Sequence, residues 1–411
     1  MRSAINRCAF NFYKNSHFGR VLLVILLFNC LMAASQTYPI ILPYSKVTHG
    51  SARIDVLLPL LKGKKVAIVT NPSGLVGKRT LVDTLLSLKV DVVKIFGPEH
   101  GFRGDVDASE LVKNGIDPVT NLPVISLYGA NKKPKPEQLE GVEVVVFDIQ
   151  DVGVRFYTYI ATMTYVMDAC ADAGIPVIVC DRPNPNGFYV DGPIMEKNCV
   201  SFLGLHPVPI VYGLTIGEYA KMVVGEKWLN SPKPCALTVV PLLNYNRKAS
   251  YQLPVAPSPN LRDAEAVLLY PSLGLFEGTI MSLGRGTNSP FKVVGHPNYL
   301  DTTFCFIPSP SPLNNNPRYN NKRCYGMNLS GNAYVNHHPN KLQLQWLIIA
   351  YKNSSVRPFF EGTFNQHAGN TRLKDEITNG VSEKIIRKNW EKDLQKFLSI
   401  RKKYLLYPDF R

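Results

Sequence analysis

Short apolar runs rich in valine and isoleucine alternate with helical segments in the first half of the chain, and this alternation constrains the fold most. Five runs have the length and composition of buried β-strands, and they lie at residues 65–70, 90–96, 122–127, 143–149 and 176–180. Helical patterns separate them, the clearest over residues 158–173 before Gly174. Strands without a polar face, alternating with helices, predict an α/β fold with a Rossmann-like, doubly wound parallel sheet.

The residue composition changes after about residue 225, where proline and asparagine become common. Further β runs are expected at residues 237–240, 291–294 and 304–307, and helices at 342–351 and 382–404. The stretch at 308–321 is expected to be a surface loop. A chain of 411 residues is long for one core, so we predict a Rossmann-like catalytic domain over residues 36–225 and a smaller C-terminal α/β domain over 226–411.

The first 35 residues have the pattern of a secretory signal peptide. Four basic residues and no acidic one accompany an apolar run over residues 21–34, and small residues fit cleavage near Ser35. This run is too short to span a bilayer. We therefore predict export, to the periplasm or the medium. Lipid attachment at Cys30 is the alternative, although the residues before that cysteine fit it poorly.

The chain is basic, with a formal net charge of +15 that falls to +11 when the four basic residues of the signal segment are removed. A solvated surface with scattered lysines is one interpretation, and attraction to an anionic cell-wall or surface glycan is the other. Basic residues are not interleaved with aromatic ones as a single-strand binding face requires, so no nucleic-acid partner is expected.

Six cysteines follow residue 35, and none forms a CxxC pair, which disfavours zinc ribbons and thioredoxin-type sites. Cys170 and Cys180 lie in apolar runs and are expected to be buried thiols, whereas Cys305 and Cys324 could form a disulfide in an oxidising compartment. No GxGxxG follows the first strand, and P-loop and GxSxG motifs are missing. We therefore expect no nucleotide cofactor and no serine-hydrolase elbow.

The glycine-rich loop at residues 97–104, Gly-Pro-Glu-His-Gly-Phe-Arg-Gly, is the first candidate site. Three glycines in eight residues indicate an unusual backbone shape or the close approach of a ligand. The loop follows a predicted strand, and ligands of open α/β sheets bind at the carboxyl ends of strands. A glutamate that only satisfies backbone donors in a tight turn is the alternative for Glu99.

A second group of carboxylates and aromatic residues lies at residues 148–159, where a strand passes into a helix. N-capping by Asp151 or Thr158 would explain one residue but not the group. Aromatic rings beside carboxylates and an arginine suit a sugar site. A metal site formed by Asp148, Asp151 and His100 is the alternative, and no HExxH or His-x-His motif supports it.

The second region adds Glu277 beside Gly278, and an arginine between two glycines at residues 284–287. An arginine on such a loop suits an anionic ligand, although a single arginine is more often only solvated. These features place a carboxylate and a cation in the half of the chain that does not contain Glu99.

Several of these motifs, taken in order, resemble the exo-β-N-acetylmuramidase family of the NamZ type. They read GPEHGFRG, FDIQDVGVRFYTY, DRPNP, SPNLRD, LYPSLGLFEGT, GRGT and IRKKYLLY, and the resemblance runs from about residue 50 to the C-terminus. It implies release of N-acetylmuramic acid from the non-reducing end of peptidoglycan fragments, in a cleft that the second domain closes. Ile280 departs from the pattern, where asparagine is expected, which puts a ligand contact at that position in doubt.

Under this resemblance Glu99 is the expected general acid, because glycoside hydrolysis needs a protonated group at the leaving oxygen. The second catalytic carboxylate is Glu277, Asp148 or Asp151, and inverting, retaining and substrate-assisted routes all stay open. The lactyl carboxylate of muramic acid calls for a cation, from Arg103, Arg155 or Arg285. The remaining expected substrate contacts are Asn71, His100, Gln150, Tyr157, Asp181, Arg182, Asn260 and Thr287.

No metal or other cofactor is expected, and the predicted partners are muramyl sugars of peptidoglycan. A metal-dependent hydrolase or deacetylase acting on cell-wall glycan is one alternative function. A non-catalytic peptidoglycan-binding protein is the other.

Overall fold

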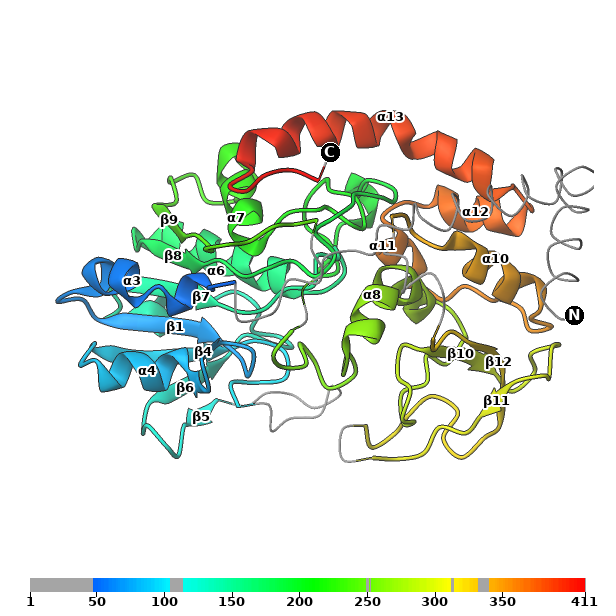
Figure 1. Ribbon diagram of the computed structural model, residues 1–411, viewed down its shortest axis with the longest axis horizontal. Helices are drawn as coiled ribbons and strands as arrows, with labels where there is room; N and C mark the ends of the chain where they lie inside the picture. Colours follow the sequence, from blue (N-terminus) through cyan, green and yellow to red (C-terminus); the bar gives the residue numbers. More distant parts are fainter. Residues whose placement is uncertain are drawn as a thin grey trace, which may run out of the picture. The chain divides into compact units, whose positions relative to one another are not determined.

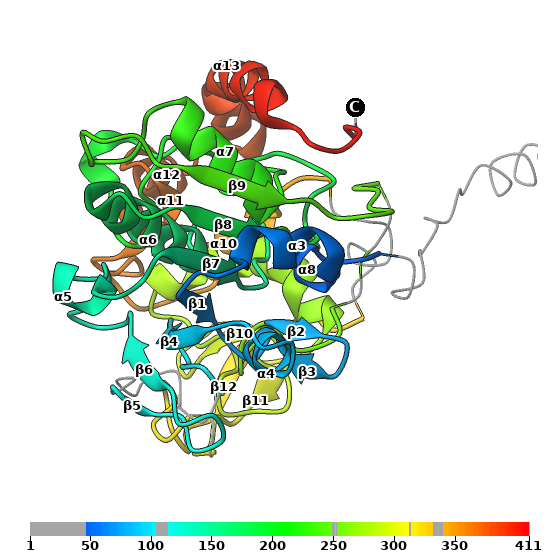
Figure 2. The same ribbon diagram turned by 90° about the vertical axis from the view of Figure 1, so that its left-hand side faces the viewer.

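The computed structural model describes residues 47–103, 114–248, 251, 253–311, 314–331 and 340–410. Its centre is a seven-stranded sheet with the order β5-β6-β4-β1-β7-β8-β9, which can be followed across Figure 2. All neighbouring strands are parallel except β5 and β6. In chain order the strands are β1 (Val66–Thr70), β4 (Val92–Gly97), β5 (Gly115–Ile116), β6 (Pro123–Ser126), β7 (Val144–Asp148), β8 (Val177–Cys180) and β9 (Leu237–Val240).

This strand order places the first strand in the middle of the sheet. The chain builds β4 and β6 on one side of β1, and then returns to build β7, β8 and β9 on the other side. The direction in which successive strands are added to the sheet therefore reverses between β1 and β7. Open α/β sheets bind ligands in the crevice at such a reversal. Here the loops that follow β1 and β7 are joined, because the amide of Gln150 donates to the Ser73 hydroxyl at 2.9 Å and the Thr70 hydroxyl donates to the Asp148 carbonyl at 2.9 Å.

Both faces of the sheet are buried, because alternate residues of each strand enter different cores. In β1, Ile68 belongs to a core formed with α3 (Ile54–Leu61) and α4 (Leu81–Ser87). Ala67 and Val69 belong to the other core, formed with α6 (Tyr159–Ala173) and α7 (Ile216–Gly225). Figure 2 shows α3 and α6 on opposite sides of the strands. The predicted parallel sheet with helices on both faces is confirmed.

The second region carries a small antiparallel sheet and several helices (Figure 1). The sheet has the order β10-β12-β11, and its strands are β10 (Val293–His296), β11 (Cys305–Phe306) and β12 (Cys324–Asn328). The helices are α8 (Ala264–Leu273), α10 (Leu344–Lys352), α11 (Phe364–Ala368), α12 (Arg372–Thr378) and α13 (Glu383–Arg401). Tyr270 and Phe364 of this region share one buried cluster with Val145 of the large sheet, so one continuous core joins both regions.

Short elements complete the described chain. They are the hairpin of β2 (Leu75–Val76) and β3 (Arg79–Thr80), the helix α5 (Pro136–Leu139), and the 3-10 turns η2 (Gly50–Ala52), η3 (Lys197–Cys199), η4 (Gly274–Gly278) and η5 (Lys402–Tyr404). In the part of the chain that the structure describes, no helix is both long and apolar enough to cross a membrane. The predicted signal segment and Cys30 lie outside the described residues.

Two details differ from the sequence-based expectations. β9, which we expected in the second region, pairs in parallel with β8, so the large sheet extends beyond residue 225. Cys305 and Cys324 are both free thiols. In the antiparallel pairing of β11 with β12, Cys305 lies opposite Tyr325, the neighbour of Cys324. Successive side chains of a strand point to opposite faces, so the two cysteines point away from each other and form no disulfide.

Candidate active site

The Glu99 loop leaves the carboxyl end of β4 in a tight, left-handed turn. His100 and Gly101 have φ values of 70° and 75°, and the amide of Gly101 donates to the Pro98 carbonyl at 2.9 Å. A positive φ is uncommon for histidine and is found mainly where the surrounding structure enforces it, often at functional sites. The predicted unusual backbone shape of this loop is confirmed for residues 97–103, and Gly104 lies outside the described residues.

The carboxyl group of Glu99 receives hydrogen bonds from two hydroxyl groups at the same edge of the sheet. Thr158, just before α6, donates to Glu99 Oε2 at 3.1 Å, and Tyr128, just after β6, donates to the same carboxyl group. Burial and the nearby charge of Glu277 raise the pKa of Glu99, whereas the two hydroxyls and Arg285 oppose that rise. A carboxyl group with a raised pKa stays protonated at higher pH and can act as a proton donor.

Glu277 and Arg285 come from the second region and face the same cavity as Glu99. Glu277 lies in η4, and Arg285 Nη2 donates to its Oε2 at 2.8 Å. The Arg285 guanidinium also lies 5.2 Å from the ring centre of Phe291. The side chains of Arg285 and Glu277 are 36% and 25% exposed, so a ligand that enters the cavity can reach both.

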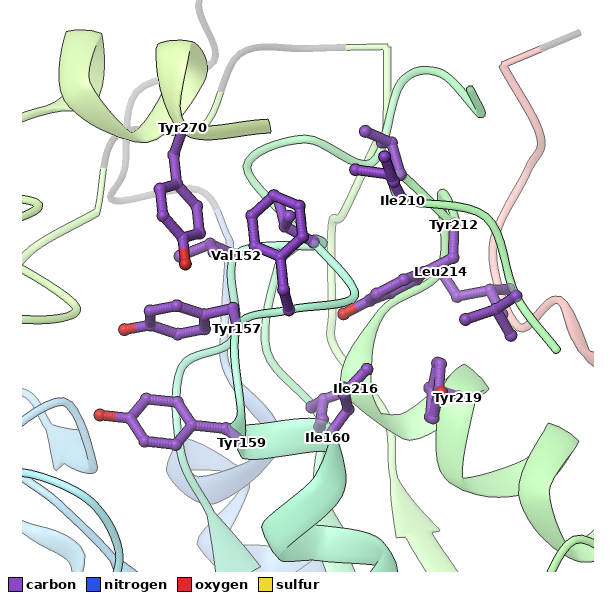
Figure 3. Close-up of a cluster of buried hydrophobic side chains, with 14 of the residues drawn as sticks. Val152, Tyr157, Tyr159, Ile160, Ile210, Tyr212, Leu214, Ile216, Tyr219 and Tyr270 are labelled. Atoms are coloured by element: carbon purple, nitrogen blue, oxygen red, sulfur yellow. The ribbon is translucent and has the colours of Figure 1, made fainter. Parts of the chain in front are cut away.

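The cavity has a volume of about 120 Å³ and a largely aromatic lining. The rings of Tyr157 and Tyr159 pack edge to face with their centroids 4.8 Å apart. The rings of Tyr157 and Tyr270 pack in the same way, with centroids 5.8 Å apart. Figure 3 shows the hydroxyl ends of Tyr157 and Tyr159 pointing the same way, away from the buried side chains of Ile160 and Ile216. Carboxylic acids, a cation and aromatic faces are the groups that a charged sugar requires.

The predicted site residues separate into three sets. Those that line the cavity are Glu99, His100, Tyr157, Asn260, Glu277 and Arg285. Asn71 and Arg103 line an adjoining pocket. The others lie elsewhere and have structural partners, and they are Asp148, Gln150, Asp151, Arg155, Asp181, Arg182 and Thr287.

Asp148 and Arg182 form a buried ion pair and do not line the cavity, which corrects the expectation for both. Arg182 Nε and Nη2 donate to the two Asp148 carboxylate oxygens at 2.6 and 2.8 Å, and both side chains are at most 1% exposed. The same guanidinium contacts His49 and Ser51, so it fixes the segment before α3 against the sheet. A carboxylate with these partners holds the fold together and is not free for chemistry at the cavity.

Asp151 and Gln150 also hold the backbone after β7. Asp151 accepts from the amide of Gly153 at 2.6 Å and from the hydroxyl of Tyr212, and burial raises its pKa to about 6. Gln150 Nε2 donates to the carbonyls of Asp151 and Pro183, both at 2.7 Å. These contacts set the course of the loop that leads to Tyr157, and neither side chain lines the cavity.

Three further expectations are corrected in the same way. The buried guanidinium of Arg155 donates to the carbonyls of Pro193, Val208 and His367, so it is not the cation for a ligand. Asp181 accepts from Thr215 and Tyr407, at 2.8 and 2.5 Å. The Thr287 hydroxyl donates to the carbonyl of Gly284 at 2.7 Å, which closes the turn that carries Arg285.

No group of three or more histidine, cysteine, aspartate or glutamate side chains is arranged to hold a metal ion among the described residues. Asp148 and Asp151, two of the three residues considered for a metal site, are held by Arg182 and Tyr212. Ile280 does not line the cavity but packs against the core, and its amide donates to the Phe359 carbonyl at 3.0 Å. The departure at this position therefore leaves the cavity unchanged.

Sequence reasoning missed two groups that contact or face Glu99. Tyr128 follows a predicted strand, so the rule that placed Glu99 at the strand edge could have found it. Thr158 was considered only as a helix cap, and the structure shows no capping hydrogen bond from its side chain. Two residues of the second region also line the cavity and were not predicted. Tyr270 stands in the motif LYPSLGLFEGT but was not singled out, and His367 lies in a segment with no recognised motif.

The sheet and the cavity define an α/β protein with a two-carboxylate site between its N-terminal sheet and its C-terminal region. Two family models match the chain: "Exo-beta-N-acetylmuramidase NamZ, N-terminal" over residues 66–265 and "Exo-beta-N-acetylmuramidase NamZ, C-terminal" over residues 268–407. The chain belongs to this family. The two models cover adjoining parts of the chain and leave only residues 266 and 267 between them.

Curated and solved proteins agree with this assignment. A "Peptidoglycan beta-N-acetylmuramidase NamZ" from Bacillus subtilis (strain 168) is 38% identical over 416 residues, which cover 93% of this chain and 97% of that protein. A crystal structure of a DUF1343 family protein from Bacteroides fragilis NCTC 9343 matches with a TM-score of 0.82 and 43% identity, covering 88% of this chain and 99% of that one. A second DUF1343 protein from the same organism has a TM-score of 0.76 and 29% identity, covering 89% and 100%.

Proposed function

We propose that this protein is an exo-acting glycosidase that releases N-acetylmuramic acid from the non-reducing end of peptidoglycan fragments, with Glu99 as the general acid. The observation that carries the proposal is the position of Glu99. It lies at the carboxyl edge of the sheet, its pKa is raised, and Glu277 lines the same cavity, whose walls include several aromatic rings. The identity of the sugar, N-acetylmuramic acid, is inferred from the family to which the chain belongs.

In this mechanism the protonated carboxyl group of Glu99 donates its proton to the glycosidic oxygen as the bond to the anomeric carbon breaks. Thr158 and Tyr128 hold the carboxyl group in position. The resulting positive charge on the sugar ring is stabilised by the carboxylate of Glu277, which acts as nucleophile, as base for water, or as partner of the sugar's acetamido group.

Arg285 is the cation that we assign to the lactyl carboxylate of muramic acid. Arg155 is satisfied by three buried carbonyls. Arg103 is held by Asp117 through two hydrogen bonds, at 2.5 and 2.8 Å. Arg285 alone of these three lines the cavity, and its planar guanidinium can form paired hydrogen bonds with a carboxylate.

The substitution Glu99→Gln tests the acid role with two substrates. Hydrolysis of a muramyl-β-1,4-N-acetylglucosamine disaccharide should fall by about 10² to 10⁴ fold. Hydrolysis of a 4-nitrophenyl muramyl glycoside should fall much less, because 4-nitrophenolate leaves without a proton. Equal losses on both substrates would contradict the assignment of Glu99 as the acid.

The anomer released from the disaccharide, followed by NMR, distinguishes an inverting from a retaining outcome. Release of no sugar by the wild-type protein, together with binding to peptidoglycan, would favour the non-catalytic alternative.

We also propose that the protein is exported, on the strength of the signal-peptide pattern at residues 1–35. N-terminal sequencing of the protein recovered from its native host tests this, with Gln36 expected as the first residue.

A further inference from the structure

A second pocket, with a volume of about 220 Å³, adjoins the cavity that contains Glu99. His100, Tyr159 and Ser258 line both spaces, so the two meet at this ridge. The remaining walls of the pocket come from residues 71–73, Arg103 and residues 256–259. The mechanism described above uses none of these walls.

Glu99 is the neighbour of His100, which lines both spaces, and this position indicates which part of a substrate the second pocket can bind. A general acid must reach the oxygen that joins two sugars, so one sugar lies on each side of it. Glu99 lines the inner cavity, and the next residue, His100, lines both spaces. A glycosidic oxygen within reach of Glu99 therefore has the inner cavity on one side and the adjoining pocket on the other.

The walls of the adjoining pocket suit a neutral sugar. Pro72, Pro257 and Pro259 give it a rigid apolar side, against which the C–H face of a pyranose ring can pack. The ring of Tyr159 is fixed in place, because Asn71 Nδ2 donates to its hydroxyl at 2.9 Å. Because this ring is already ordered, a bound sugar does not have to immobilise it, and the entropic cost of sugar binding stays low.

The electrostatics of the pocket disfavour an anionic ligand. Arg103, the lysine- or arginine-type cation among the described residues that line the pocket, is bound by both oxygens of Asp117 and lies 3.6 Å from Asp83. Two carboxylates thus surround one guanidinium, which leaves the group with a net negative charge. A carboxylate-bearing stem peptide would be repelled here, whereas hydroxyl and acetamido groups can still accept hydrogen bonds from the guanidinium edge.

We propose that the pocket formed by residues 71–73, His100, Arg103, Tyr159 and residues 256–259 is the subsite for the leaving sugar, a neutral N-acetylhexosamine, and that the inner cavity receives the muramyl unit. This proposal rests on the proposed function. It deepens that function by assigning each half of the scissile disaccharide to its own part of the site.

The substitution Ala256→Trp tests the proposal, because Ala256 is exposed, lines the adjoining pocket and does not line the inner cavity. Two substrates are compared: the muramyl-N-acetylglucosamine disaccharide, and a β-muramyl fluoride whose leaving group is a single atom. We expect kcat/KM for the disaccharide to fall at least about tenfold, which corresponds to about 1.4 kcal/mol, while the fluoride is hydrolysed within about twofold of the wild-type rate. Ala173→Trp, at another exposed alanine, is the matched control and should change neither rate.

Retained fluoride hydrolysis also shows that the Ala256→Trp protein is folded. Equal losses on both substrates, or an unchanged rate on the disaccharide, would overturn the subsite. If the pocket receives a stem peptide instead, only substrates with a peptide on the lactyl group would be slowed, and this outcome too would overturn it. Failure of the wild-type protein to hydrolyse either substrate would refute the proposed function itself, and so is distinguishable from failure of the subsite alone.

Discussion

Around Glu99, neighbouring groups act on the pKa of one carboxyl in opposite directions. Burial and the negative charge of Glu277 favour the protonated form, whereas the hydroxyls of Thr158 and Tyr128 and the charge of Arg285 favour the ionised form. The net effect is a raised pKa. A general acid needs this balance, because it must be protonated at working pH and must still release its proton in the transition state.

This balance predicts how the pH profile of kcat/KM moves on substitution. Activity needs protonated Glu99, so it falls as pH rises through the pKa of this group. Thr158→Val removes a hydrogen bond that stabilises the carboxylate, which raises the pKa and moves the alkaline limb to higher pH. Glu277→Gln removes a charge that destabilises the carboxylate, which lowers the pKa and moves the limb to lower pH.

The measurement is kcat/KM against pH on the muramyl-β-1,4-N-acetylglucosamine disaccharide, whose leaving oxygen needs the proton of Glu99. Tyr128→Phe should move the limb in the same direction as Thr158→Val, since both side chains donate to Glu99. If Thr158→Val and Glu277→Gln both moved the alkaline limb of the pH profile in the same direction, the pKa that determines this limb would belong to a group other than Glu99.

The assignment of Arg285 predicts a loss of selectivity rather than a loss of all activity. Arg285→Met should lower the ratio of kcat/KM for a muramyl substrate over the matching N-acetylglucosaminyl substrate, which lacks the lactyl carboxylate, by about tenfold or more. Arg285→Lys should retain part of the ratio, because lysine keeps the charge but not the planar fork. Arg103→Met is the control, and the same drop in its ratio would argue against Arg285 as the lactyl contact.

At the scale of elements, α6 connects the site to the sheet. Its first residue, Tyr159, lines both the cavity and the adjoining pocket, and Thr158 just before it contacts Glu99. The helix ends at Gly174, which has a φ of 71° and whose amide donates to the carbonyls of Ala171 and Cys170. A helix that ends sharply returns the chain directly into β8, so the positions of its two ends are coupled.

Gly174→Ala should therefore destabilise the protein by about 1 kcal/mol. A methyl group at this position would meet no atom within 4 Å, so the cost comes from the left-handed backbone and not from a clash. Gly174→Asn should cost less, because asparagine tolerates this conformation better. Urea unfolding measures both, and an equal cost for the two variants would point to a cause other than backbone conformation.

At the scale of the whole described chain, the C-terminal segment holds the large sheet. The Tyr407 hydroxyl donates to Asp181 after β8 at 2.5 Å, and Glu218 of α7 accepts from the amide of Leu406 at 2.8 Å. Arg247 donates to Glu218 at 2.6 Å and to the carbonyl of Pro408 at 2.9 Å. These buried polar groups depend on one another, so removal of one leaves others unsatisfied.

Tyr407→Phe should lower the free energy of unfolding by about 1–3 kcal/mol, because it removes a hydrogen bond from a fully buried carboxyl. The control is Tyr404→Phe, which removes a hydroxyl that contacts the partly exposed Glu226 and should cost less. Thermal unfolding followed by circular dichroism compares the two variants. A larger loss for Tyr404→Phe would mean that the C-terminal segment is not held through Asp181.

The sequence predicted the strands of the large sheet well, but it did not predict that the run at residues 237–240 joins that sheet. Strands β1, β4, β6, β7 and β8 lie where the apolar runs indicated, because strands buried on both faces consist mainly of apolar residues. β9 was assigned to the wrong region, since a short run such as residues 237–240 carries no information about its pairing partner. Parallel pairing between distant segments is decided by tertiary packing.

For the site, the sequence by itself determined the family, the Glu99 loop and the sheet edge on which the loop lies, because these depend on local residue order and strand length. Only the tertiary structure decided which polar residues share the cavity. Asp148, Asp151 and Arg155 stand in the same motif as Tyr157, yet their side chains are committed to Arg182, Tyr212 and backbone carbonyls. Glu277 and Arg285 lie far along the chain and still face Glu99. A sequence motif records which groups are near one another along the backbone, whereas burial and hydrogen-bond partners, which decide whether a charge is structural or available to a ligand, arise only on folding.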